Sequence, residues 1–261
     1  MGIYKAEAIV LRSMVYKEAD RILTLFTREE GKVSAIARGV RKTTSRLRGA
    51  VQLFSHTHLV LYSGRSLDTV SQGDAEEHFS YLEQDLERFS TASYCAELVD
   101  RLTQAREQQP KVFFLLLSAL RALKNGNPEL TARVFELKLL DILGFCPSLT
   151  ECVVGNHPFS IETEELKQVW FNIEEGGIVC PACAENCEGV RSFSPATLGA
   201  LGYFLRAPLE QAIKAKLNSH VLRELAGLLQ GFLTYHGDAR LRSRSFLDAF
   251  RNEDAGNGHN K

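Results

Sequence analysis

The cysteines are the side chains best suited to chemistry in this chain, because five of the six lie within one segment. Cys180 and Cys183 form a Cys-x-x-Cys pair, Cys187 follows four residues later, and Cys152 lies upstream with Cys146 before it. Two thiolates on one tight turn can ligate the same ion. Clustered cysteines in a cytoplasmic chain favour tetrahedral zinc over disulfides. The spacing therefore predicts zinc that staples a segment with little apolar mass.

The fourth ligand of this site is open at the level of sequence. A regular ribbon would supply a second Cys-x-x-Cys pair, but the matching position is Gly155. Cys187 is the first choice because it is close in sequence, and Cys146 and His157 are the alternatives. An iron–sulfur cluster and a relic knuckle of free thiols are the competing interpretations. The predicted ligand set of one zinc ion per chain is Cys152, Cys180, Cys183 and Cys187.

A second set of candidate residues lies in segment 32–48, which contains six Lys or Arg residues and no Asp or Glu. Its centre, RGVRKTTSRLRG, is typical of an exposed loop between strands. Guanidinium groups donate paired hydrogen bonds to phosphates, so on a small barrel this loop predicts nucleic-acid binding. A solvated loop without a partner is the alternative interpretation. The candidate binding residues are Arg12, Lys17, Arg21, Lys32, Arg38, Arg41, Lys42, Arg46 and Arg48.

Aromatic and histidine side chains in the same half offer weaker candidates. Proteins that bind single strands also stack bases on aromatic rings, and Tyr16, beside a lysine, suits that role. We expect Phe26 and Phe54 to fill the core instead. His56 and His58 lie two residues apart on a predicted strand and so share a face. They could hold a metal, but ordinary strand residues near the surface are the favoured interpretation.

Catalytic motifs are missing from the sequence. It contains no His-x-Glu beside a Cys-x-x-Cys pair, no HExxH, no GxSxG and no Walker lysine loop. A zinc enzyme needs an open coordination position and a nearby acid–base group, whereas a cluster of thiolates is typical of a closed structural site. We therefore expect a binding protein and not an enzyme.

The elements that position the basic loop are five short predicted strands joined by tight turns. Apolar and polar residues alternate along them, imperfectly, as in a small closed barrel such as an OB-fold. An SH3-like barrel would give nearly the same pattern. The predicted strands span residues 6–15, 21–26, 32–37, 56–62 and 66–71.

At Asp74 the hydrophobic period changes to spacings of three and four, which predicts amphipathic helices. Cys95 lies on the apolar side of the first of these, and Gly144 is the expected C-terminal cap of the third. The predicted helices span residues 79–102, 111–124, 129–143, 195–205, 209–216 and 221–235.

The predicted architecture is thus an α+β multidomain chain: an N-terminal five-stranded OB-fold barrel, then an α-helical bundle with a small cysteine-rich zinc insert. We expect a barrel domain over residues 1–73 and a helical domain over 74–250, which contains the insert at 146–194. Residues 251–261 are polar, with Gly and Asn, and predict a flexible tail.

Charge is distributed unevenly along the chain. Residues 1–73 contain twelve Lys or Arg and six Asp or Glu, a balance of +6, whereas the remainder contains nineteen and twenty-six, a balance of −7. A basic module joined to an acidic one is consistent with nucleic-acid contact by the first. No apolar run of about 18 residues and no signal-peptide pattern occur, so we expect a cytoplasmic protein.

Taken together, these segments resemble the RecO family of bacterial DNA repair proteins over nearly the whole chain, to about Phe250. The resemblance rests on EAIVLRSMVYKEADRILTLFTREEGKVSAIARGVRK, SRLRGAVQLFS, LGFCPSLTECVV, GGIVCPAC and the closing SRSFL. It implies an OB-fold, a helical domain and a zinc insert. Zinc-bearing members usually have a cysteine where this chain has Gly155, and some members have lost the metal.

The resemblance also implies a function. Members of the family bind single- and double-stranded DNA, anneal complementary strands and help load the RecA recombinase, with RecR and the single-stranded DNA-binding protein SSB as partners. An RNA- or ribosome-associated zinc protein using the same barrel surface is the alternative, because phosphate contacts do not distinguish the two nucleic acids.

Overall fold

The structure is a computed structural model that describes residues 2–159 and 167–237. The chain forms two compact units, one running up to Lys124 and the other starting at Asn125. The predicted tail at 251–261 and the SRSFL segment lie outside the described residues. Within the described ranges, none of the helices combines the length and hydropathy needed to cross a bilayer.

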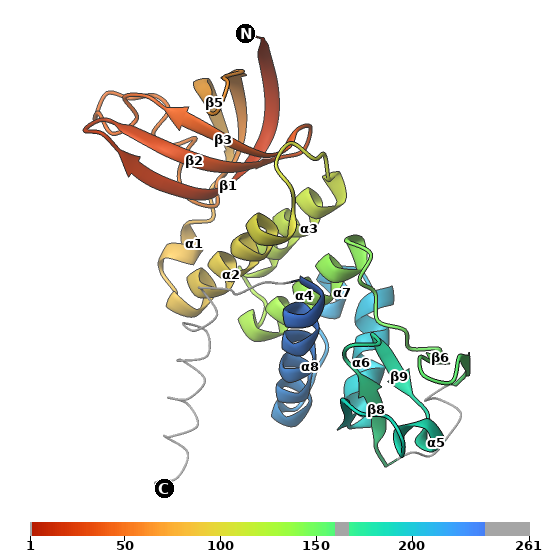
Figure 1. The fold of residues 1–261 in the computed structure, drawn as a ribbon. Coiled ribbons are helices and arrows are strands. Elements are labelled where there is room, and N and C mark those ends of the chain that lie inside the picture. The colour runs from red at the N-terminus through yellow and green to blue at the C-terminus, as the bar shows by residue number, and fades with distance from the viewer. Residues whose placement is uncertain (1, 160–166, 238–261) are drawn as a thin grey trace, which may run out of the picture. The chain divides into compact units, whose positions relative to one another are not determined.

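The first unit begins with a closed five-stranded barrel of strand order β1-β2-β3-β5-β4 (Figure 1). Neighbouring strands are antiparallel except β3 and β5, which pair in parallel and close the barrel. The prediction of an N-terminal OB-like barrel is confirmed. Its strands are β1 (Ile3–Tyr16), β2 (Asp20–Thr27), β3 (Gly31–Ala37), β4 (His56–Tyr62) and β5 (Asp68–Glu77).

The alternation of residues along the strands places one face in the core, because successive side chains of a strand point to opposite faces. Ala8 and Val10 of β1, Leu23 and Leu25 of β2 and Ala35 of β3 are fully buried together. β1 pairs with β4 through its first half and with β2 through its second half. A register shift between Val10 and Arg12 lets this 14-residue strand bend around the barrel.

The predicted change from strand to helix at Asp74 is wrong, because β5 continues to Glu77. The C-terminal residues of this strand are mostly polar and show no clear alternation of apolar and polar side chains. Pairing of His58 with Asp74 and of His56 with Glu77 extends the strand through them. The predicted helix 79–102 is divided into α1 (Ser80–Glu83) and α2 (Leu86–Leu102), since the Asp85 side chain caps α2 by accepting from the N–H of Arg88.

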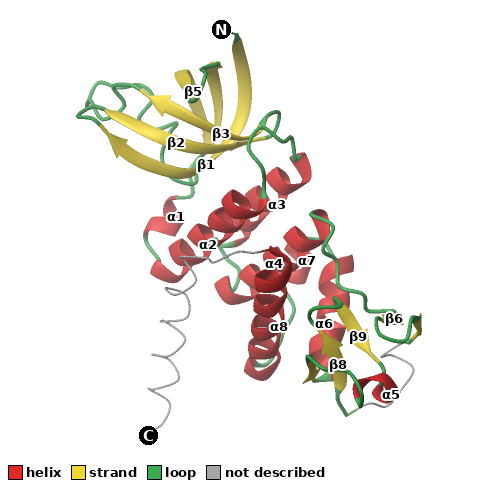
Figure 2. Cartoon of the chain, in the orientation of Figure 1, coloured by secondary structure: helices red, strands yellow, loops and turns green. Residues whose placement is uncertain are grey.

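The remaining predicted helices form close to their expected bounds (Figure 2). Asn127 caps α4 through its side chain, and Gly144 follows that helix with a φ of +89°, as expected of a C-terminal cap. The helix predicted at 209–216 is shorter than expected. These helices are α3 (Pro110–Ala122), α4 (Pro128–Ile142), α6 (Pro195–Arg206), α7 (Leu209–Ala212) and α8 (Ser219–Gly237).

The cysteine-rich insert of the second unit consists of short strands and one helical turn. A three-stranded sheet of order β10-β8-β9 is covered by α8, where the rings of Phe171 and Phe232 lie 6.2 Å apart. A separate two-stranded ribbon joins β6 to β7. The elements are β6 (Glu151–Cys152), β7 (His157–Pro158), β8 (Val169–Asn172), β9 (Gly177–Val179), α5 (Pro181–Ala184) and β10 (Val190–Phe193).

The connection between α2 and α3 docks on the barrel at the start of β3. The N–H of Arg106 donates to the carbonyl of Lys32 at 3.0 Å. A Cβ atom at Gly31 would lie 1.8 Å from the carbonyl oxygen of Glu107, so only glycine permits this approach. Arg106 also pairs with the buried Asp68 at 2.6 Å.

Asp68 joins three parts of the first unit through its carboxylate. It accepts hydrogen bonds from the hydroxyl of Tyr4, the N–H of Gly64 and the guanidinium of Arg106. Burial opposes its ionisation, but these hydrogen bonds outweigh that effect and lower the pKa of Asp68 below its ordinary value of 3.8. The ionised carboxylate therefore stabilises the fold above that pH, and its contribution is lost as the pH falls through the lowered pKa.

Replacing Asp68 with Asn should reduce the free energy of unfolding at neutral pH by about 2 kcal/mol, because a neutral amide replaces the buried carboxylate that pairs with Arg106 at 2.6 Å. The variant should also show a shallower loss of stability below about pH 4. Urea denaturation at several pH values measures both effects. Asp74→Asn, at an exposed position of the same strand, is the matched control, and equal curves for the two variants would contradict the role of Asp68.

Candidate nucleic-acid interface and metal centre

The segment between β3 and β4 is an ordered series of turns and not an extended loop. The N–H of Gly39 donates to the Asp20 carboxylate at 2.8 Å, and the N–H of Arg41 donates to the carbonyl of Ala19 at 3.0 Å. Gly39 has a φ of +65°, which a residue with a side chain would adopt only with strain. These bonds attach the start of the segment to the turn between β1 and β2.

Apolar side chains of the same segment enter the barrel core. Val40, Ala50 and Val51 are each 3% exposed and belong to the buried cluster formed by the strands, with Leu47 packed against it. The Cβ position of Gly73 in β5 would contact the side chains of Ala50 and Leu47. Burial of these residues fixes the segment on the barrel.

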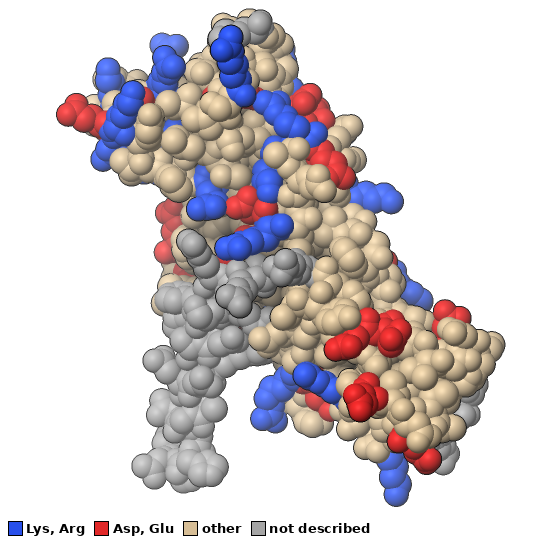
Figure 3. Space-filling model, viewed as in Figure 1, with Lys and Arg blue, Asp and Glu red and all other residues tan. Residues whose placement is uncertain are grey.

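The basic residues before and between these anchors are exposed and face solvent. Within the described part of the chain, none of the five forms an ion pair with a carboxylate. Arg41 donates to the carbonyl of Glu18 at 2.8 Å, which orients its guanidinium and leaves its charge uncompensated. Lys and Arg side chains stand out over the barrel in the view of Figure 3. The exposed residues, here called the cationic loop, are Arg38, Arg41, Lys42, Arg46 and Arg48.

Two other predicted binding residues are engaged by α2. The Lys32 ammonium, which is 18% exposed, lies 3.4 Å from the carboxylate of Asp100 and donates to the carbonyl of Thr103 at 2.8 Å. Arg12 reaches the same Asp100 carboxylate at 3.3 Å but is more than half exposed. Lys32 therefore holds the barrel to the C-terminal end of α2, where a cation is favoured by the helix dipole.

The remaining predicted residues lie around the turn between β1 and β2. Arg21 donates to the hydroxyl of Ser13 at 3.0 Å and is only partly exposed. Lys17 occupies the turn with a φ of +53°, and its ammonium lies 5.4 Å from the centre of the Tyr16 ring. Tyr16 is 40% exposed, whereas Phe26 and Phe54 are buried, as predicted for core residues.

A hollow of about 960 Å³ opens beside the cationic loop. Arg21, Arg41 and Arg48 line one part of it, and Glu83 and Asp85, from the start of the helical segment, line another. Val40, Val51, Leu53, Leu86 and Phe89 supply its apolar lining. The hollow thus has cationic, apolar and acidic surfaces, and the cationic part is continuous with the loop.

The two histidines of β4 differ in environment. His56 is 1% exposed, contrary to the surface position predicted for it, and its ring packs 5.9 Å from that of Phe113. Its Nε2 atom lies 2.9 Å from the carboxylate of Glu7 and 3.5 Å from that of Glu76. His58 is exposed and contacts Glu76 at 2.8 Å. These pairs, together with an ion pair between Arg28 and Glu7, account for the carboxylates gathered here.

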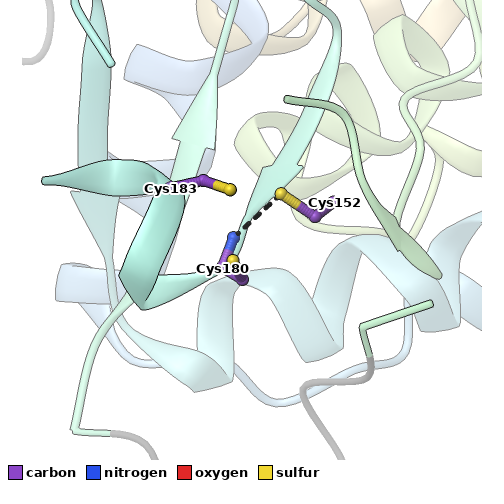
Figure 4. Close-up of side chains that lie close together, drawn as sticks. All are labelled: Cys152, Cys180 and Cys183. Carbon is purple, nitrogen blue, oxygen red and sulfur yellow. Dashed lines mark hydrogen bonds between the residues drawn. The ribbon is translucent and has the colours of Figure 1, made fainter. Parts of the chain in front are cut away.

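Three of the four predicted metal ligands come together in the second unit (Figure 4). The sulfur atoms of Cys152, Cys180 and Cys183 lie within 4.8 Å of one another. Thiolates in a tetrahedral zinc site lie about 3.8 Å apart, as a metal–sulfur distance of about 2.3 Å requires. Cys152 ends β6, Cys180 precedes α5 and Cys183 lies within α5, so zinc would join the ribbon to the sheet. The donor set and its spacing fit such an ion.

Backbone amides surround the Cys152 sulfur. It accepts from the N–H of Cys180 at 3.3 Å and from that of Gly155 at 3.4 Å. Burial opposes ionisation, but these hydrogen bonds prevail and lower the pKa of Cys152 to about 7. Hydrogen bonding to Cys180, burial and repulsion from neighbouring thiolates raise the pKa of Cys183 to about 11. A bound cation would relieve that repulsion and displace the protons.

The structure does not bring Cys187 into this cluster. Its sulfur accepts from the Asn172 amide at 3.4 Å, and Cys146 lies elsewhere, its pKa raised to about 11 by burial and by Asp141. Cys95 is fully buried in α2, as predicted. Sequence spacing favoured Cys187 over His157, although the Gly-Asn dipeptide that precedes His157 is a hairpin signal that could have indicated the ribbon.

Two family profiles match this chain in succession. The profile described as Recombination protein O N terminal matches residues 1–79, and that described as Recombination protein O C terminal matches residues 83–245.

Relatives named DNA repair protein RecO are similar along their full length. The chain is 42% identical to that of Pelotomaculum thermopropionicum over 99% of this chain and 98% of the relative. It is 39% identical to that of Symbiobacterium thermophilum over 96% and 99%, and 36% identical to that of Desulforamulus reducens over the whole of both.

The two profiles match, in order, a closed barrel and the helices with a cysteine-rich insert that follow it. This combination defines a recombination protein of the O type. The chain belongs to the RecO family of DNA repair proteins.

Replacing Lys32 with Met should reduce the free energy of unfolding by about 1–2 kcal/mol, because the carbonyl groups at the end of α2 lose their cationic donor. The same replacement at Lys42, which is exposed in the cationic loop, should change stability by less than about 0.5 kcal/mol. Urea denaturation of both variants distinguishes a lysine that joins barrel and helix from one that faces solvent. Equal stabilities would contradict the assignment of Lys32 to that junction.

Proposed function

We propose that this protein binds single- and double-stranded DNA through the cationic loop and the adjoining barrel surface. The observation that carries the proposal is the arrangement of the loop, in which buried apolar anchors alternate with exposed cations that have no carboxylate partner among the described residues. An anchored cation loses less conformational freedom on binding phosphate than one on a free chain. Lys17 in the β1–β2 turn and Arg21 at the start of β2 adjoin this surface, and Arg12 contributes its exposed part.

Binding by this surface also supports strand annealing. Cations that contact phosphates release condensed counterions and reduce the repulsion between two complementary strands. The apolar lining of the hollow beside the loop, together with the exposed ring of Tyr16, offers surfaces for unstacked bases. Contacts of this kind do not depend on sequence, which suits a protein that anneals arbitrary strands.

Membership of the family supports a wider role. We propose that the protein acts in DNA recombination and repair as a mediator that assists loading of RecA onto SSB-coated single strands, together with RecR. In this role it functions by binding and not by catalysis. An association with RNA would use the same phosphate contacts, so RNA is included as a competitor in the test below.

We further propose that Cys152, Cys180 and Cys183 hold one zinc ion per chain. The ion would stabilise the insert by joining β6 and the turn before α5, segments with few apolar residues of their own. Thiolate-rich zinc sites are typically structural and have all four positions filled by protein ligands, so we expect a fourth protein ligand beside these three cysteines.

Replacing Arg38 and Arg46 with Ala should weaken binding of single-stranded DNA about tenfold near 0.1 M salt. It should also reduce the slope of log affinity against log salt by about 1.4, or roughly 0.7 per phosphate contact. Lys5→Ala with Arg65→Ala removes the same charge from exposed barrel positions outside the loop and serves as the control. Fluorescence anisotropy across a salt series measures both slopes, and annealing rates with bare and SSB-coated strands give a second readout.

Equal effects of the two double variants would place the binding surface elsewhere on the barrel. Structured RNA that competes as well as single-stranded DNA would favour the RNA-associated alternative instead.

Removing zinc should destabilise the insert. We expect about one zinc ion per chain by elemental analysis, lost when Cys180 and Cys183 are replaced with Ser and retained in Cys146→Ser, whose sulfur is outside the cluster. Chelation should lower the melting temperature of the wild type and leave that of the double variant unchanged. Purified protein that lacks metal and melts at the same temperature with or without added zinc would disprove the site.

A further inference from the structure

The ribbon formed by β6 and β7 places one more possible ligand beside the three cysteines. Cys152 and His157 are direct partners in the antiparallel register of this ribbon. Side chains of directly opposed residues in an antiparallel pair lie on the same face, with Cβ atoms about 5 Å apart. His157 therefore projects to the side on which the Cys152 sulfur lies.

Gly155 shows how near the imidazole comes to the cluster. A Cβ atom at this position would lie 3.1 Å from the sulfur of Cys183 and 2.5 Å from the Nδ1 atom of His157. The missing side chain would thus point at the thiols, and the ring of His157 occupies the space it leaves. His157 is exposed, so its ring can adjust to bring Nδ1 to the distance of about 2.0 Å that a zinc–imidazole bond requires.

We infer that His157 is the fourth zinc ligand, so that this chain builds a site of three thiolates and one imidazole in which the histidine takes the place of a cysteine at position 155. The inference rests on the zinc site proposed above and adds the identity of its last ligand. Three thiolates and a neutral imidazole are a common tetrahedral set for structural zinc. They give the site a net charge of −1, whereas four thiolates would give −2.

The other candidates are less well placed. Neither Cys187 nor His157 belongs to the group of three as it stands, but the Cys187 sulfur also accepts a hydrogen bond from the Asn172 side chain. Cys146 interacts with Asp141 and with its neighbour's carbonyl. Either sulfur would have to leave these partners to reach the cluster, whereas the His157 ring already lies beside the Cβ position of Gly155, which is 3.1 Å from the Cys183 sulfur.

The inference is tested with the full chain loaded with Co²⁺ in place of zinc, because cobalt absorption reports the number of thiolates bound. The wild type should show the charge-transfer intensity of three cobalt–sulfur bonds. His157→Ala should keep that intensity, lose affinity for the metal at least tenfold in competition with a chelator, and change its ligand-field bands as water replaces imidazole.

A second substitution provides a rescue. Gly155 lies outside the left-handed backbone region, and the nearest atoms to a side chain there belong to His157 and Cys183, so cysteine can be accommodated. The double variant Gly155→Cys with His157→Ala should recover the lost affinity and raise the charge-transfer intensity by about one third, as a fourth thiolate binds. Cys187→Ser and His220→Ala, the latter an exposed histidine of the same unit, should match the wild type in both respects.

The possible outcomes distinguish the assignment of His157 as a ligand from the existence of the zinc site. Metal bound as tightly by His157→Ala as by the wild type, or lost in Cys187→Ser, overturns the assignment of His157 and leaves the zinc site standing. A wild-type chain that takes up neither cobalt nor zinc overturns both.

Discussion

The positively charged surface of this protein depends on the burial of a few apolar side chains between the third and fourth strands. Val40, Ala50 and Val51 complete the barrel core, and removing them from water is the dominant favourable contribution to ordering the segment. Once these residues point inward, the intervening Arg and Lys side chains can only point outward. Hydrophobic burial therefore holds the charged side chains at the surface, and a segment of the same charge without these anchors would be a disordered basic loop between the two strands.

A related constraint holds the barrel to the helices that follow it. Lys32 contacts the end of α2, Gly31 lets the next connection approach, and Asp68 pairs with Arg106. Each contact joins residues far apart in sequence, and breaking the contact of Lys32 or of Asp68 leaves a buried polar group without that partner. Arg12 and Lys32 form ion pairs with Asp100, whereas the side chains of the cationic loop remain without a carboxylate partner among the described residues. Basic residues of the first unit thus have two distinct roles.

The cysteine-rich insert is stabilised in a different way from the barrel. Its strands are two to four residues long, too short to be stable by backbone pairing alone. One face of its sheet is covered by α8 through Phe232, and the β6–β7 ribbon has only two residues in each strand. Three thiols from β6 and from the turn at α5 lie close together, and a metal ion bound to them would join the ribbon to the sheet.

Local patterns in the sequence determined the elements and their chemistry. The structure contains the strands and helices that the hydrophobic periods predict, and Gly144 follows α4 in the left-handed conformation expected of a cap. The Cys-x-x-Cys pair and the basic segment are likewise read from neighbouring residues. All of these features depend on residues close together in sequence. Only the tertiary structure decided that β5 runs on to Glu77, that Lys32 and His56 are withdrawn from the surface, and that the Cys187 sulfur stays outside the group of three thiols. Those outcomes depend on contacts between segments distant in sequence, and such contacts leave no period or spacing that a sequence could display.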